Sequence, residues 1–314
     1  MKTILITGGG GYVGSVLVNY FLERNKKIIV LDTFWFGNYL PKHENLKIIK
    51  GDTRFFDEKI LKNVSSVVHL ANVANDPAVD LNPTLSWEVN VLATYNLISK
   101  CIKYKVKQFI FASSGSVYGV KKEVRVTEDL TLVPISTYNK TKMVAERVLM
   151  SYSNKIKIHC IRPATVCGLS PRMRFDVSVN NLTMQALTKK KITVFGGNQI
   201  RPNIHINDLV NLYNFFINNP NIKSGFYNAG FENISIMSIA KLVSKVTNAK
   251  IEVTKLIDQR SYRQDSTKIL KLGFKNKFKV IDAINDLKKA FELKKLKVTP
   301  NTFTVKWMKK NKIS

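Results

Sequence analysis

Three side chains near the middle of the sequence, Ser114, Tyr138 and Lys142, have the chemistry to move a proton. Tyr138 and Lys142 stand four residues apart in a helical pattern, which puts them on one face, and Ser114 follows the apolar run 108–112. A nearby cation lowers the pKa of a phenol, which is about 10 when free, by roughly 1 to 3 units. We expect Tyr138 to be the acid/base, Lys142 to lower the pKa of Tyr138, and Ser114 to orient a substrate oxygen. In a lysine-rich chain the same spacing also arises by chance on a solvated helix face.

The elements that must position these residues begin at the N-terminus. The run 2–7 is typical of a short strand, and a glycine-rich turn and a helical pattern follow it up to residue 24. This order is the setting in which a glycine turn binds the phosphates of a dinucleotide, with the helix N-terminus facing the anion. A purely structural turn is the alternative. The residues expected to bind the cofactor here are Gly8, Gly11, Tyr12, Val13 and Gly14.

Asp32 decides between these two interpretations of the turn. The run 28–31 is fully apolar, as expected for a strand buried on both faces, and it ends at Asp32, about twenty residues after the glycines. A carboxylate there suits the two hydroxyls of an adenosine ribose and repels a 2'-phosphate. The sequence therefore predicts that the cofactor is NAD rather than NADP.

Further strands are expected at 46–50, 67–70 and 108–112, and their carboxyl ends should line one crevice. The fold class predicted is α/β, a doubly wound parallel Rossmann sheet with a smaller C-terminal substrate lobe. Asp52 is a candidate for the adenine edge, with an ordinary turn aspartate as the alternative. Other residues at these strand ends are Thr53, Leu70 and Ala71, expected near the cofactor, and Val73 and Ser116, expected near the substrate.

The residues between the fourth and fifth strands are expected to form a loop, 75–83, and a long helix, 85–103. Asn90 lies inside that helix. It either satisfies a neighbouring polar group or orients the helix that carries Tyr138.

Length and composition indicate one or two domains of a protein with an ordinary globular core, since 314 residues are 45% hydrophobic and 23% charged. Cys101, Cys160 and Cys167 have no metal-binding or disulfide spacing, so no metal is expected. No run is long and apolar enough for a membrane span or a signal peptide, which predicts a cytoplasmic protein without a membrane partner.

The formal net charge of +28 raises the question of a nucleic-acid partner. The lysines are spread along the chain among many Asn and Ile, as biased genomic composition also produces, and no nucleic-acid motif accompanies them. We therefore expect no nucleic-acid partner. The basic run 288–312 is expected to be a solvated, partly frayed tail.

Taken together, these motifs resemble the extended short-chain dehydrogenase/reductases, in the nucleotide-sugar epimerase/dehydratase branch that includes UDP-galactose 4-epimerase. The likeness runs over nearly the whole chain. It implies that Ser114, Tyr138 and Lys142 form a triad, that Lys142 also holds the nicotinamide ribose, and that a sugar hydroxyl, usually at C4, is oxidised to a 4-keto sugar. The segments that carry the resemblance are 7–14, Asp32, 69–71, 113–119, 138–142 and 162–163.

Departures from the family pattern narrow the expected reaction. The 4,6-dehydratases of the family that this chain resembles carry two acidic residues after the catalytic hydroxyl, where this chain has Gly115 and Ser116. The epimerase-reductases of GDP-fucose synthesis carry a cysteine where Ser116 stands. The chemistry that remains is at a single carbinol carbon: 4-epimerisation, net 4-oxidation, or reduction of a 4-keto sugar.

The second half of the chain should bind the nucleoside-diphosphate sugar. We expect a Rossmann domain over 1–165, with 205–228 returning to it, and a substrate lobe formed by 166–204 and 229–314. Two guanidinium groups, Arg172 and Arg174, could bind a diphosphate or a sugar hydroxyl, with surface ion pairing as the alternative. By resemblance, the further substrate residues are Asn180, Asn181, Phe195, Arg201 and either Arg260 or Arg263.

The function expected is an NAD-dependent epimerase or dehydrogenase acting at C4 of a nucleoside-diphosphate sugar for a capsule or another surface polysaccharide. Segments 75–78 and 170–174 resemble a subgroup whose substrates include GDP-manno sugars and GDP-heptoses. By resemblance the protein is a homodimer that pairs through helices 85–103 and 138–151. Reduction of a 4-keto sugar is one alternative, and a non-catalytic module that senses NAD or binds nucleic acid is another.

Overall fold

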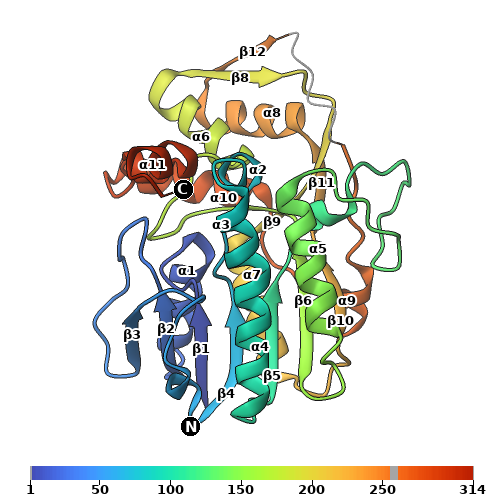
Figure 1. Ribbon diagram of the computed structural model, residues 1–314. Helices are drawn as coiled ribbons and strands as arrows, with labels where there is room; N and C mark the ends of the chain where they lie inside the picture. Colours follow the sequence, from blue (N-terminus) through green and yellow to red (C-terminus); the bar gives the residue numbers. More distant parts are fainter. Residues whose placement is uncertain (1, 255–260, 314) are drawn as a thin grey trace.

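The computed structural model describes residues 2–254 and 261–313. Its centre is a seven-stranded sheet in the order β10-β6-β5-β4-β1-β2-β3, in which every neighbouring pair is parallel (Figure 1). Strand order reverses at β1, as in a doubly wound Rossmann sheet, so the predicted fold class is confirmed. The strands are β1 (Thr3–Thr7), β2 (Lys27–Asp32), β3 (Leu46–Lys50), β4 (Val64–His69), β5 (Gln108–Ala112), β6 (Lys157–Pro163) and β10 (Gly225–Ala229).

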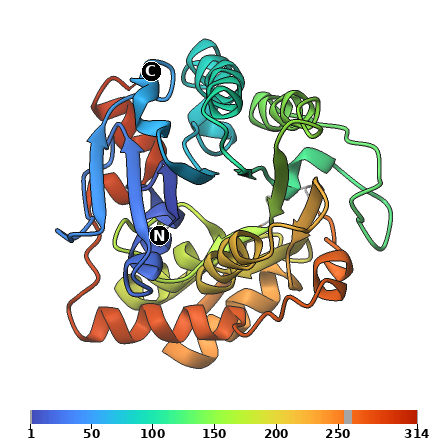
Figure 2. The ribbon, with the colours of Figure 1, turned by 90° about the horizontal axis from the view of Figure 1, so that it is seen from below.

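Helices cover both faces of this sheet (Figure 2). Helices α1 (Tyr12–Leu22) and α7 (Ile206–Asn218) pack on one face in a core that includes Ile6 and Phe216. Helices α4 (Ala93–Lys103) and α5 (Thr137–Met150) pack on the other face. Strands β1, β2 and β5 are mostly buried and apolar, as expected for strands covered on both faces, whereas the edge strand β3 is largely exposed.

The segment before α4 differs from the expectation. The predicted loop contains α2 (Asp76–Val79), and α3 (Pro83–Trp87) leads through a π-helical turn (Glu88–Leu92) into α4, so the predicted long helix has an irregular first half. Asn75 and Asn82 begin the two short helices by accepting backbone N–H bonds from Ala78 and Leu85. Asn caps of this kind stabilise a first helical turn, and the sequence analysis missed them.

The second lobe lies beyond the carboxyl ends of the large sheet (Figure 1). Its core joins three helices to the β8 strand through Ile192, Val194, Ile239 and Ile284. Its elements are β7 (Thr165–Cys167), α6 (Ser178–Lys189), β8 (Lys191–Phe195), β9 (Ile200–His205), β11 (Glu232–Ser235), α8 (Ile236–Thr247), β12 (Lys250–Thr254) and α10 (Val280–Glu292). Helix α9 (Thr267–Lys271) instead packs beside β10, with Ile269 in the core of the large sheet. Single 3-10 turns lie at Glu58–Leu61, Gly115–Tyr118 and Pro300–Thr302.

Residues 206–229 return to the first lobe, where they supply α7 and β10 to the large sheet. On this basis we propose the division given by the sequence, with 1–165 and 205–228 in the cofactor lobe and 166–204 and 229–314 in the substrate lobe. Limited proteolysis that cut first within the sheet-forming segments would contradict it.

The C-terminal segment is not the frayed tail that was expected. After α10 the chain turns back, and α11 (Thr304–Lys310) lies between the lobe and the carboxyl ends of β1 and β2 (Figure 1). Trp307 Nε1 donates to the carbonyl oxygen of Trp35 at 2.6 Å, and Met308 is buried against Val73 and Val89. The lysines of this segment face solvent while its apolar residues dock, a pattern that the charge count concealed.

Candidate active site

A cavity of about 930 Å³ lies between the carboxyl ends of the large sheet and the second lobe. A smaller cavity of about 110 Å³ shares the glycine turn with it and extends toward Asp32. The predicted residues that line the large cavity are Gly8, Gly11, Tyr12, Val13, Gly14, Leu70, Val73, Ser114, Ser116, Tyr138, Lys142, Arg172, Arg174, Asn181, Phe195 and Arg201. Those that line the smaller one also include Asp32, Asp52, Thr53 and Ala71.

The glycine turn has the shape that a dinucleotide requires. Gly8 has φ +73°, and a Cβ there would lie 2.5 Å from the backbone nitrogen of Ala71. A Cβ on Gly14 would collide with the carbonyl oxygen of Gly8. The turn therefore stays free of side chains, and the first N–H groups of α1 remain open to a diphosphate.

Asp32 is held at the end of β2 by two backbone donors. The N–H of Gly10 donates to its Oδ2 at 2.8 Å, and the N–H of Phe34 donates to its Oδ1 at 2.6 Å. Burial raises the pKa of Asp32, and these two bonds oppose the rise. The carboxylate is thereby fixed beside the glycine turn, where a ribose with two free hydroxyls would lie, so the residues present fit NAD.

Asp52 also lines the smaller cavity, but its carboxylate is already engaged. Its Oδ2 pairs with Arg54 at 2.9 Å, and Arg54 in turn pairs with Glu88 at 2.6 Å. The N–H of Arg54 also donates to Asp52, which is the turn-aspartate arrangement named as the alternative. An adenine contact by this side chain would require Arg54 to move.

The three expected catalytic side chains meet in the large cavity. Ser114 begins the 3-10 turn after β5, and its Oγ lies 2.7 Å from Ser116 Oγ. A side-chain hydrogen bond also joins Ser114 to the phenol of Tyr138. Lys142, one turn along α5, is buried and donates from Nζ to the carbonyl oxygen of Ala112 at 2.8 Å.

The pKa expectation for Tyr138 is wrong for the site as it stands. Burial raises the pKa of Tyr138 to about 12, and the charge of Arg174 and the bond from Ser114 oppose the rise. Lys142 is not among the groups that lower it. Burial also brings the pKa of Lys142 itself down to about 7. Its Nζ lies 6.0 Å from the centre of the Tyr138 ring. Desolvation, which the sequence could not reveal, outweighs the helical spacing.

Charged groups of both signs flank Tyr138. Arg174 lowers its pKa and Asp76 raises it. Arg174 also pairs with Asp176, with 2.8 Å between Nε and Oδ1, while Asp76 accepts a hydrogen bond from Ser136 Oγ, the residue that caps α5. The sequence did not place these acidic residues in the site, because Asp76 at the start of α2 and Asp176 in the loop before α6 are both distant from Tyr138 along the chain.

Asn90 fills both roles that the sequence left open, because it satisfies a neighbouring backbone group and contacts the helix that carries Tyr138. Its Oδ1 accepts from the N–H of Val73 at 2.8 Å, and its Nδ2 donates to Thr141 Oγ1 at 3.1 Å. It therefore ties the end of β4 to the helix between Tyr138 and Lys142. The π-helical turn around Asn90 is a feature often found at functional sites.

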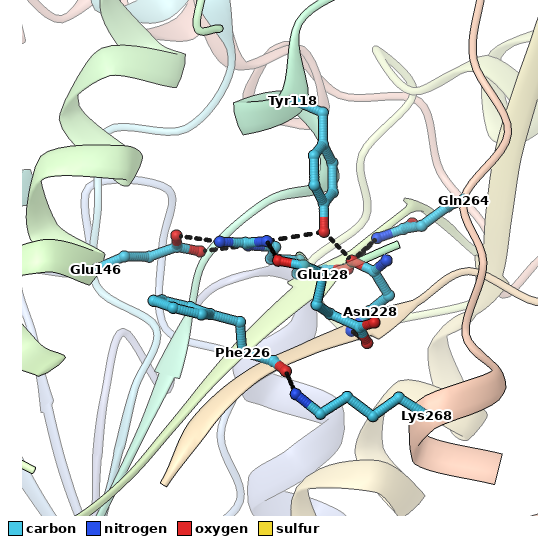
Figure 3. A network of polar contacts seen from close by, with 8 residues as sticks. Tyr118, Glu128, Glu146, Phe226, Asn228, Gln264 and Lys268 are labelled. Carbon is cyan, nitrogen blue, oxygen red and sulfur yellow. Dashed lines mark hydrogen bonds and ion pairs between the residues drawn. The ribbon is translucent and has the colours of Figure 1, made fainter. Parts of the chain in front are cut away.

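A buried polar network fixes the other side of α5 (Figure 3). Arg162 on β6 donates to both carboxylate oxygens of Glu146 at 2.9 and 2.8 Å and to Tyr118 Oη at 2.7 Å. Tyr118 donates to Asn228 Oδ1 at 2.8 Å, and Gln264 donates to the same oxygen at 3.0 Å. Because both charges are buried and fully hydrogen-bonded, the network holds α5 in one position against β5 and β6.

The remaining predicted substrate residues divide into two groups. Asn181, Phe195 and Arg201 line the cavity. Asn180 does not: its Oδ1 accepts from the N–H of Gly168 at 3.1 Å, and its Nδ2 donates to Tyr12 Oη at 3.0 Å. We therefore correct the expectation for Asn180, which joins the glycine turn to the lobe. Arg260 lies outside the described residues.

Several residues that line the cavity were not predicted. Trp35 and Phe36 follow Asp32 in an aromatic run that could have signalled a ligand wall after the second strand. Thr304 and Met308 offered no such sign, because they reach the cavity by a return of the chain across more than two hundred residues. Other polar residues that line the cavity and were not predicted include Asp76, Ser136, Asp176, Gln185 and Gln199.

Residues 4–230 match the model of the NAD dependent epimerase/dehydratase family. The chain belongs to this family. The UDP-glucose 4-epimerase of Lactobacillus helveticus is 28% identical over 90% of this chain and 94% of its own length. The cofactor is NAD, and the protein is an enzyme of the nucleotide-sugar epimerase/dehydratase type.

Solved structures agree with this assignment. The UDP-N-acetylglucosamine 4-epimerase from Methanobrevibacter ruminantium M1, in complex with UDP-N-acetylmuramic acid, superposes with a TM-score of 0.85 at 25% identity, over 93% of this chain and 99% of that one. MoeE5 in complex with UDP-glucuronic acid and NAD superposes with a TM-score of 0.84 at 25% identity, over 93% of this chain and all of that one.

Proposed function

We propose that this enzyme oxidises C4 of a nucleoside-diphosphate sugar to a 4-keto sugar and returns the hydride within one catalytic cycle, as a net 4-epimerase. The observation that carries the proposal is the contact of Ser114 with Tyr138 in a cavity that opens both to the glycine turn and to the lobe residues Arg174, Asn181 and Arg201. A ligand there can reach a proton acceptor and a cofactor at once.

The residues have distinct roles in this mechanism. NAD, when bound, accepts the hydride that leaves C4 and gives it back. Ionised Tyr138 accepts the proton of the C4 hydroxyl as the carbonyl forms, and it returns that proton when C4 is reduced from the opposite face. Ser114 donates its single hydroxyl proton to the sugar oxygen, and Lys142 orients the ribose of the cofactor. Arg174 stabilises the phenolate form of Tyr138, which must be present before the proton is accepted.

The names of the relatives support a UDP-sugar substrate, since both the L. helveticus and M. ruminantium enzymes are described as UDP-sugar 4-epimerases. No relative reported above carries a GDP-sugar, so the expected GDP-manno or GDP-heptose substrate rests on sequence segments alone. We therefore propose UDP-hexoses as the first substrates to assay, with GDP-mannose as the comparison.

The decisive experiment replaces the proton carrier. Tyr138→Phe should lower kcat by about 10² to 10⁴ while NAD binding is kept, because it removes acid/base chemistry without removing the ring. Turnover is measured by the interconversion of UDP-glucose and UDP-galactose, with Tyr104→Phe, remote on α4, as the control. Undiminished turnover by the Tyr138 variant would refute the mechanism.

The same assay separates the alternatives. Free NADH accumulating in proportion to sugar consumed identifies a net dehydrogenase, and consumption of NADH only when a 4-keto sugar is supplied identifies a reductase. No turnover with any nucleotide sugar by wild-type protein that binds NAD would favour a sensor. The cytoplasmic location stays a prediction that cell fractionation tests; no helix in residues 2–254 or 261–313 is long and apolar enough to cross a membrane.

A further inference from the structure

Arg172 is a buried cation that lacks a polar partner. Its side chain is 4% exposed, its Nε makes no hydrogen bond, and within residues 2–254 and 261–313 no acidic side chain pairs with it. A guanidinium is a strong fivefold donor, and leaving one desolvated and unpaired is costly. Because Arg172 also lines the large cavity, the missing partner is a ligand that enters there.

The surroundings of Arg172 place it on the cofactor side of that cavity. Its guanidinium carbon lies 4.0 Å from the centre of the Phe36 ring, on the segment that follows Asp32. Burial and Arg174 bring the pKa of Arg172 down to about 9, while the nearby Asp176, Tyr39 and Asp32 oppose that fall. The planar cation is thus oriented by an aromatic face beside the expected adenosine ribose.

A second contact fixes the loop of Arg172 against the phosphate-binding turn. Ser170 Oγ donates to the carbonyl oxygen of Tyr12 at 2.7 Å and lies 3.0 Å from Ser15 Oγ. Both partners belong to the first turn of α1, whose N-terminus faces the cavity. These bonds fix the loop against the first turn of α1.

Arg174, two residues later, provides the contrast. Its charge is balanced by Asp176, and it acts on Tyr138, the residue proposed to touch the sugar. Arg174 is thus neutralised by its own ion pair, whereas the Nε of Arg172 has no hydrogen-bond partner. This difference favours separate ligands for two arginines that the sequence assigned alike to the substrate.

We propose that Arg172 binds the diphosphate of NAD, so that the substrate lobe supplies the cation that the glycine turn lacks. The free N–H groups of α1 would bind one side of the diphosphate, and the guanidinium, stacked on Phe36, would bind the other by charge-assisted hydrogen bonds. This inference depends on the cofactor and not on the proposed sugar substrate.

The test measures binding of each ligand separately by titration calorimetry. Arg172→Gln should weaken the binding of NAD and of ADP-ribose by roughly 10-fold to 100-fold, the usual loss for a hydrogen bond to a charged group, and should leave the binding of UDP and GDP within twofold. Arg24→Gln is the control, because Arg24 also stacks on a ring, that of Tyr20 at 3.5 Å, but at the surface.

Either other pattern overturns the proposal. Loss of UDP or GDP affinity with NAD affinity intact would assign Arg172 to the substrate diphosphate. Unchanged affinity for all four ligands would mean that Arg172 binds the phosphate groups of none of them. Should Arg172→Gln fold poorly by circular dichroism, Phe36→Leu serves instead: removing the stacking ring should weaken NAD and ADP-ribose severalfold but not UDP. Equal loss for all ligands in that variant would contradict the assignment.

Discussion

Lys142 is an amine that lines the large cavity and is almost fully buried. Its side chain is 1% exposed, its Nζ has the carbonyl oxygen of Ala112 as acceptor, and Glu146 is the group that raises its pKa against burial. The result is a pKa of about 7 in place of 10.5. Burial of Lys142 therefore lowers the stability of the folded protein, but the residue lies where chemistry on a sugar hydroxyl would use it.

That cost predicts a dependence of stability on pH. Between about pH 7 and 10.5 the unfolded chain holds the Lys142 proton and the folded chain does not, so this residue makes the free energy of unfolding rise with pH across that window. The slope is up to about 1.4 kcal/mol per pH unit. Below pH 7 both states are protonated, and the burial penalty is present in full.

Lys142→Met should remove this slope and stabilise the protein at pH 7, while turnover falls at least about 100-fold. Urea unfolding at half-unit steps from pH 6 to 10 measures the slope, with the exposed Lys140→Met as the control. Parallel stability curves for wild type and Lys142→Met would show that Lys142 titrates normally and is not buried as described.

Among the elements, α5 and α11 do most to define the cavity. Helix α5 is tied at its start by Ser136 to Asp76, in its middle by Thr141 to Asn90, and at Glu146 to Arg162 (Figure 3). Helix α11 is held less firmly, by the Trp307 bond to Trp35 and by the packing of Met308. Since Met308 lines the large cavity, α11 is positioned to delay the escape of a bound cofactor.

Met308→Ala should therefore speed NAD dissociation by about three- to tenfold, because truncating a buried Met weakens packing by roughly 2 to 5 kcal/mol and lets a short helix open locally. Stopped-flow displacement of bound NADH measures the rate, and hydrogen exchange over 304–310 reports the opening. The exposed Lys310→Ala on the same helix is the matched control. If hydrogen exchange in α11 became faster while the rate of NADH dissociation stayed unchanged, opening of α11 would not control cofactor release.

The sequence was informative where function depends on neighbours along the chain. The glycine turn, Asp32 and the spacing of Tyr138 and Lys142 were all recognisable, because each is encoded within one strand, turn or helix. The pKa of Tyr138 and the position of Arg172 were not, since desolvation and the Phe36 stack exist only after the lobe closes on the sheet. Asn180 was misassigned for the same reason. The family pattern around it was visible in the sequence, but its hydrogen-bond partners lie on α1 and on the loop after β7, which are distant along the chain.

The whole molecule carries a formal charge of +28, and several large apolar side chains are exposed on its surface. Trp87, Leu92 and Tyr95 are exposed by 37%, 56% and 46% along the continuous stretch formed by α3, the π-helical turn and α4. This stretch lies beside α5, so the two helices expected to pair in a homodimer are adjacent at the surface. Apolar residues of this size on a charged protein favour association.

We propose that two copies pair through this face, and the charge sets how the pairing responds to salt. Two strongly positive chains repel over about 10 Å at 0.1 M salt, so dimerisation should tighten from 0.05 to 0.5 M as screening increases. Light scattering should give twice the 35.7 kDa chain mass for wild type, and Leu92→Glu should shift it to one chain mass. Val124→Glu, the same change at an exposed valine elsewhere, should leave the dimer intact. A Leu92→Glu protein that stayed dimeric would place the interface on another face, and dissociation on adding salt would mean that ion pairs hold the copies together.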